Sequence, residues 1–155
     1  MIRKFWFFFL FALVIAMFAV AQEDEDDDDA LPYPPNALLV AAYMGDVGLV
    51  QEILAAGVDT DYRSASGGTA LHMAILQNNI EVVKLLLDYG FSPNAKDSKD
   101  GYTCLHMAVA ANNPEAVRLL LQYKVDKNIK CFAGLTALEK ARKEDKADLV
   151  RLLYR

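Results

Sequence analysis

The sequence of 155 residues has few of the side chains that perform chemistry, with only two histidines, two cysteines and one tryptophan. It contains no Asn-x-Ser/Thr glycosylation site, and no phosphate-cradling glycine loop or Ser-His-Asp set stands out. Both histidines belong to one recurring motif. The residues therefore favour a protein that is not an enzyme, and they indicate neither a bound metal nor a cofactor.

Charge is unbalanced only near the N-terminus. Seven of the 21 acidic residues stand together in Glu23–Asp29, and two of the 16 basic residues fall within the first four positions. The rest of the chain has equal numbers of both signs, which argues against nucleic acid as a partner. A run of seven carboxylates stays solvated, so we interpret residues 22–35 as a linker, first acidic and then proline-rich.

Residues 1–21 have the pattern of a secretory signal peptide. Arg3 and Lys4 precede an unbroken apolar run, 5–21, which closes on the small-residue sequence Ala-Val-Ala. Cations stay on the cytoplasmic side of a membrane, so we expect the domain outside the cytoplasm, in a bacterial periplasm. The alternative is an uncleaved membrane anchor, because 17 apolar residues reach the lower limit of the spanning range of roughly 17–25.

The remainder of the chain repeats with a period of 33 or 34 residues. The clearest recurring position is an alanine, at Ala41, Ala74, Ala108 and Ala141. A residue that can cap a helix N-terminus recurs in step with it, at Asn36, Thr69, Thr103 and Thr136. A residue that tolerates left-handed backbone follows each alanine, at Gly45, Asn78, Asn112 and Asp145.

Each unit is thus predicted to be a short helix, a tight turn, a second helix and an extended connection. In the second unit we expect helices over 70–77 and 80–88. Helices of eight or nine residues are too short to be stable alone, so the units must stack into a solenoid. The predicted repeat domain is 36–155, with units 36–66, 67–100, 101–133 and 134–155.

The sequences TALHMA at 69–74 and TCLHMA at 103–108 resemble the Thr-Pro-Leu-His-x-Ala signature of the ankyrin repeat, and TALEKA at 136–141 is a degenerate third copy. The resemblance covers residues 36–155 and implies an all-α ankyrin-repeat solenoid of four helix-turn-helix units with finger loops. Proline is absent from all three copies, which weakens helix initiation without changing the fold.

The resemblance also implies roles for individual residues. The motif histidines would hydrogen-bond near the threonine and reach backbone in the adjoining loop, so the structural set is Thr69, His72, Thr103, His106 and Thr136. Ankyrin arrays bind other proteins on a concave face, and its positions here are Tyr43, Met44, Leu76, Gln77, Lys99, Tyr102, Phe132 and Leu135. We therefore expect a non-catalytic protein-binding module whose partner is another protein, unless several of these side chains tuck under neighbouring loops.

A narrower alternative and one from a different functional class remain open at this point. The protein could be an immunity or inhibitor protein that neutralises a toxin or enzyme in the same compartment. It could instead have a redox or enzymatic role that uses Cys104 or Cys131. These two cysteines are the only ones, and an oxidising compartment permits a disulfide between them; otherwise they are inert, partly buried thiols.

Overall fold

The computed structural model describes residues 33–123 and 125–154, which lie in one compact unit, Leu31–Arg155. The expected signal peptide at 1–21 and nearly all of the linker at 22–35 lie outside the described residues. Within the described ranges the chain is all-α, with eight helices and no strand. None of these helices has the length and apolar character needed to cross a bilayer.

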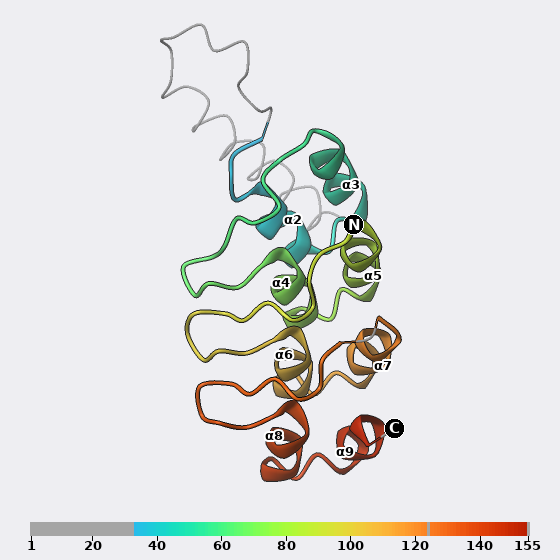
Figure 1. Cartoon of the computed structure of the whole chain (residues 1–155). Helices are drawn as coiled ribbons and strands as arrows, with labels where there is room; N and C mark the ends of the chain where they lie inside the picture. Colours follow the sequence, from blue (N-terminus) through green and yellow to red (C-terminus); the bar gives the residue numbers. More distant parts are fainter. Residues whose placement is uncertain (1–32, 124, 155) are drawn as a thin grey trace, which may run out of the picture. The chain divides into compact units, whose positions relative to one another are not determined.

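The helices form four antiparallel pairs, in agreement with the predicted solenoid. The first helices of the pairs are α2 (Ala37–Met44), α4 (Ala70–Leu76), α6 (Cys104–Ala110) and α8 (Ala137–Lys143). The second helices are α3 (Val47–Ala55), α5 (Ile80–Tyr89), α7 (Pro114–Gln122) and α9 (Ala147–Leu153). Figure 1 shows the first helices in one row and the second helices in another, with each helix packed on its counterpart in the next pair.

Long connections link each pair to the next and project from the side of the first helices (Figure 1). We call them finger loops one, two and three, and they comprise residues 56–69, 90–103 and 125–136. Adjacent loops are joined by backbone hydrogen bonds. Ser98 N–H donates to Ser66 O at 2.9 Å, and Phe132 N–H donates to Asp100 O at 3.0 Å.

The turns inside the pairs follow from residues that tolerate left-handed backbone. Gly45 has φ 76°, Asn78 59°, Asn112 52° and Asp145 54°. The sequence predicted this conformation at all four positions. Asparagine and aspartate adopt it at lower cost than other residues that carry a Cβ atom. Each first helix ends one or two residues before its left-handed residue.

Capping boxes start three of the first helices. Thr69, Thr103 and Thr136 each pair reciprocally with the third helical residue, which is His72, His106 and Glu139 respectively. Asn36 differs, because its side chain makes no capping bond to α2. Its φ and ψ of −89° and 0° place it outside the extended conformation that a capping side chain needs.

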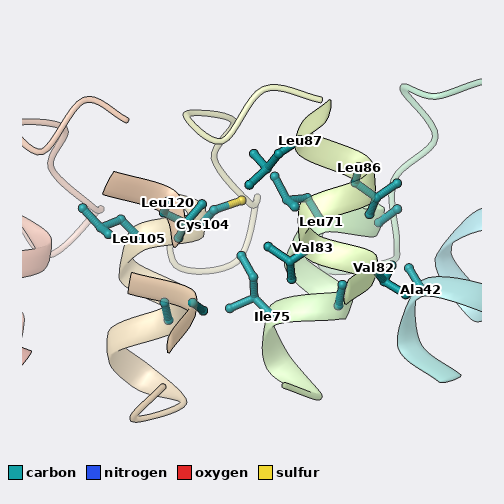
Figure 2. Close-up of a cluster of buried hydrophobic side chains, with 14 of the residues drawn as sticks. Ala42, Leu71, Ile75, Val82, Val83, Leu86, Leu87, Cys104, Leu105 and Leu120 are labelled. Atoms are coloured by element: carbon teal, nitrogen blue, oxygen red, sulfur yellow. The ribbon is translucent and has the colours of Figure 1, made fainter. Parts of the chain in front are cut away.

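The hydrophobic core runs continuously through the stack between the two rows of helices. Leu71 and Ile75 of α4 and Leu86 of α5 are fully buried, and they belong to the same hydrophobic cluster as Leu105 and Leu120 of the next pair (Figure 2). Complete burial of one such side chain contributes roughly 1.5–3 kcal/mol. The packing partners belong to neighbouring repeats, so each short helix is stabilised by the repeats on either side.

Polar side chains also cap the first helices across the stacking interface. Asn79 Nδ2 donates to Ala42 O at 2.9 Å and to Tyr43 O at 3.0 Å. Two repeats later, at the equivalent position, Lys146 Nζ donates to Val109 O at 2.6 Å. These bonds satisfy carbonyl groups at a helix C-terminus that have no partner within their own helix, and the lysine also complements the helix dipole there.

Candidate functional site

His72 connects the N-terminus of α4 to finger loop two. The ring is completely buried. Its Nδ1 atom accepts from the Thr69 backbone N–H at 3.2 Å and lies 2.9 Å from the Thr69 hydroxyl, while Nε2 lies 3.1 Å from Tyr102 O. A carbonyl oxygen can only accept, so Nε2 carries the proton and the imidazole is neutral. One side chain thereby holds a helix start and the following loop together.

His106 repeats this arrangement one unit later. Its Nδ1 atom lies 2.9 Å from the Thr103 hydroxyl, and Nε2 donates to Leu135 O in finger loop three at 2.9 Å. Burial lowers the pKa of both histidines, which keeps them neutral. All the polar atoms of the two rings have partners, so neither ring presents a free nitrogen for proton transfer or metal binding.

Asp97 organises finger loop two from within. Its side chain is buried, and its Oδ1 atom accepts from the backbone N–H of Asp100 at 2.9 Å and of Tyr102 at 3.2 Å. Arg63 from finger loop one donates to Lys96 O at 3.1 Å. The loops are therefore rigidly built and joined to each other, which gives a preformed surface.

Both cysteines are free, buried thiols in the structure, in place of the disulfide considered above. Cys104, at the first position of α6, points back toward the preceding repeat, and its sulfur lies 4.0 Å from both ring nitrogens of His72. Cys131 lies in finger loop three, which leads toward the following repeat. Burial raises the pKa of the Cys104 thiol far above its ordinary range, so the thiolate needed for redox or nucleophilic chemistry does not form at neutral pH.

The described residues contain no group of three or more His, Cys, Asp and Glu side chains that could hold a metal ion. The buried polar side chains of the described residues serve capping and loop contacts instead. The surface also has several large apolar side chains that are exposed to solvent.

Large apolar side chains lie exposed at the C-terminal ends of the first helices. Tyr43 is 50% exposed, Met44 47% and Leu76 46%. Tyr43 and Leu76 occupy equivalent positions in α2 and α4, which pack against each other. We call these three residues the apolar cluster. Gln77 extends it as an exposed polar side chain.

The predicted partner-binding residues of the finger loops do not all face solvent. Phe132 is 67% exposed at the tip of loop three, and Lys99 is exposed at the tip of loop two. Leu135 is half-buried, and its carbonyl oxygen is occupied by His106. The structure therefore places Phe132 and Lys99 on the surface and makes Leu135 part of the repeat interface.

Tyr102 was expected on the binding face, but the structure gives it a packing role. Its ring stacks on His106 with centroids 5.7 Å apart. Lys140 Nζ donates to the Tyr102 hydroxyl at 3.0 Å and lies 4.8 Å from the ring centroid. This role was not predicted from the sequence, because Tyr102 meets Lys140 only across a stacking interface. The signal was present in the repeat register, which places Lys140 one position after the equivalent of His106.

Comparison with known families accounts for this architecture. The family model described as ankyrin repeats (3 copies) matches residues 12–97, and a second, ankyrin repeats (many copies), matches residues 75–121. The first match alone covers more than half of the chain. This chain belongs to the ankyrin repeat family.

The curated relatives share only part of their length with it. The chain is 42% identical over 67 residues to a glycerophosphocholine phosphodiesterase, gde1, from Schizosaccharomyces pombe. The matched segment is 43% of this chain and 6% of that protein. It is 34% identical over 62 residues to a putative ankyrin repeat-containing protein from Treponema pallidum, 40% of this chain and 21% of that protein. An E3 ubiquitin-protein ligase, KEG, from Arabidopsis thaliana is 46% identical over 50 residues, 32% of this chain and 3% of the relative.

These three relatives differ in the activities that their names state, and the chain spans at most 21% of any of them. Ankyrin repeats are in general protein–protein interaction modules without catalytic activity. That general role is the one that this ankyrin-repeat chain shares with its family.

Proposed function

We propose that this ankyrin-repeat protein binds another protein outside the cytoplasm, without catalysis, through the exposed side of its first helices. The observation that carries the proposal is the apolar cluster. Tyr43, Met44 and Leu76 are each close to half exposed in a fold that buries most of its other large aliphatic side chains. Contiguous exposed apolar side chains that include an aromatic residue are typical of binding anchors.

The rigid framework around the cluster supports the same proposal. The Asn79 bonds to Ala42 and Tyr43 hold the C-terminal end of α2, and the capping box and the His72 bonds hold the start of α4. A preformed surface loses little conformational entropy on binding. Affinity can then come from burying a few side chains.

The extracytoplasmic location rests on the sequence of residues 1–21. The basic start, the apolar run and the Ala-Val-Ala ending favour export. A fusion of alkaline phosphatase to the C-terminus of the full chain tests it in a bacterial host, because this enzyme gains its disulfides and its activity only outside the cytoplasm. If the fusion with the double substitution Arg3→Glu, Lys4→Glu kept its phosphatase activity, export by this segment would be contradicted. If the fusion with the unaltered sequence had no phosphatase activity, the extracytoplasmic location would be contradicted.

Site-specific photo-crosslinking tests the binding face. With p-benzoylphenylalanine in place of Met44 or Gln77, we expect light to join the full-length protein to a discrete partner in its native host. The matched control places the same group at Gln51, which is exposed on α3, in the row of second helices. Equal crosslinking from position 51, or none from 44 and 77, would remove the proposed face.

A further inference from the structure

The exposed ends of the first helices change character along the stack. At one equivalent position the residues are Tyr43, Leu76, Ala110 and Lys143, and at the next they are Met44, Gln77, Ala111 and Glu144. Three of the four side chains in the first two repeats are thus large and apolar, two alanines occupy the third repeat, and charges occupy the fourth. The surface is graded rather than uniform.

A hollow lies beside Leu76, where the third repeat has the small side chain of Ala111. The hollow is open to solvent, has a volume of about 290 Å³ and lies between the turn after α4 and the turn before α7. Leu76, Ala111 and Pro114 give it apolar walls, while Asn78, Asn112 and Glu115 lie along its polar side. Small-molecule pockets start at roughly 300 Å³ and enclose most of their ligand, so this open hollow suits a side chain that projects from a larger partner.

Cations are concentrated in the fourth repeat, which follows the two repeats that line the hollow. The last turn of α8 carries Lys140, Arg142 and Lys143. Glu144 pairs with Lys140 at 2.5 Å and with Lys146 at 2.7 Å, so one carboxylate is shared by two ammonium groups. Lys143 is exposed and has no ion pair within the described residues. In contrast, α2, α4 and α6 contain no Asp, Glu, Lys or Arg.

We propose that the hollow receives one apolar side chain from an extended or helical segment of a partner protein, and that acidic residues of the same segment lie toward Lys143. The apolar side chain buries Leu76, Ala111 and Pro114, and the carboxylates complement the excess positive charge at the end of α8. The exposed amides of Gln77 and Asn112 supply donors and acceptors for the backbone of that segment. This inference rests on the proposed function and adds the chemistry of the ligand to it.

A library of random twelve-residue peptides displayed on phage tests the proposal with the full chain as bait. We expect enriched peptides to combine a Leu, Ile, Met or Phe residue with Asp or Glu within the next few positions. Enrichment of peptides without acidic residues, or no enrichment at all, would overturn it.

Variants of the bait test separately the apolar contact in the hollow and the acidic contact at Lys143. Ala111→Trp fills the hollow and should weaken binding of a selected peptide by about tenfold or more, as loss of an anchor contact does. Lys143→Glu should weaken it by about threefold or more at low salt, with the effect fading at high salt. The controls are Ala55→Trp and Arg118→Glu on the exposed side of the second helices, and both should bind as the wild type does.

The outcome distinguishes this inference from the proposed function. Crosslinking to the native partner from position 44 that persists unchanged in Ala111→Trp would leave the binding face in place and refute the hollow as the anchor site. Loss of that crosslink in Ala111→Trp, with unchanged urea denaturation, would support both.

Discussion

The Nε2 atom of His72 donates a hydrogen bond to the carbonyl oxygen of Tyr102 at 3.1 Å, from α4 to the loop of the next repeat. The ring of Tyr102 in turn stacks on His106, which bonds Leu135 one repeat further on. Motif histidines and loop carbonyls therefore form a chain of contacts through repeats two, three and four. The stability of each repeat depends on these contacts as well as on the core.

Replacement of His106 by alanine should destabilise the protein strongly. It leaves the Thr103 N–H without its partner and removes one of the two bonds to the Leu135 carbonyl, which keeps the bond from the Cys131 N–H. Losing a cap and a buried hydrogen bond together costs roughly 1–3.5 kcal/mol. Urea denaturation followed by circular dichroism measures the change. The control is Glu139→Ala, which removes the equivalent but exposed capping residue of α8 and should cost only about 1 kcal/mol. Equal losses in the two variants would refute the loop contact as a stabilising element.

Stability should fall as the pH is lowered below about 7. Burial depresses the folded-state pKa of His72 and His106 below the ordinary value of 6.5, so the unfolded chain binds more protons in this range. The stabilisation that the two neutral histidines provide is complete above pH 6.5. It is lost as the pH falls toward their pKa in the folded protein. Exposed carboxylates with lowered pKa, such as Glu139, act at lower pH. Urea midpoints at pH 7.5 and 5.5 test this.

The double variant His72→Gln, His106→Gln is the control for that pH dependence. It removes both titrating groups while each amide can still reach a hydrogen-bond partner. The difference between the two midpoints should shrink in this variant. An undiminished difference would assign the pH dependence to other groups.

Tyr102→Ala should cost roughly 1–3 kcal/mol, because the stack on His106 and the Lys140 cation above the ring are both lost. Tyr102→Phe keeps the ring and loses only the bond from Lys140 to the hydroxyl, so it should cost about 0.5–1.5 kcal/mol. Thermal unfolding compares the two. A phenylalanine variant as unstable as the alanine variant would mean that the stacking contributes little.

Cys104 should resist thiol reagents in the folded protein. The side chain is completely buried and its pKa is raised, so Ellman's reagent at pH 8 should modify it only after urea is added. Mass spectrometry of non-reduced protein from its native host gives the oxidation state of both cysteines. A fast reaction without urea, or the mass of an internal disulfide, would contradict two buried free thiols.

Cys131→Asp should stabilise finger loop three. Cys131 N–H donates to Leu135 O at 2.9 Å, as Asp97 N–H donates to Tyr102 O in loop two. An aspartate at 131 could accept from backbone N–H groups of its loop as Asp97 does, for a gain of about 0.5–1.5 kcal/mol. The converse variant, Asp97→Cys, should lose stability. Unchanged thermal unfolding of both variants would show that this side chain does not hold the loop.

Much of the fold could be predicted because its signals are local. The left-handed turns at Asn78, Asn112 and Asp145 depend on what one residue tolerates, and the capping boxes depend on residues three positions apart. The ends of α4 and α5 differ from the predicted ends by one residue each. The cap expected at Asn36 is absent because its backbone, at the entry to the first helix, is not extended.

The candidate site was less predictable, because exposure depends on neighbours that are distant in sequence. Tyr43 and Leu76 are exposed as expected. The ring of Tyr102 instead stacks on His106, and its hydroxyl accepts a hydrogen bond from Lys140, 38 residues away. The hollow beside Leu76 forms only because Ala111 and Pro114 of the next repeat line it together with Leu76.

The sequence by itself determined the repeat, its register and, to within one residue in the second unit, the ends of its helices, because each depends on spacing along one or two units. Only the tertiary structure decided which aromatic side chains are exposed to solvent, that Cys104 faces His72, and that a hollow lies beside Leu76. Those properties arise when residues about 30 to 38 positions apart are brought together, and the energy of such contacts belongs to the interface between repeats rather than to any single repeat.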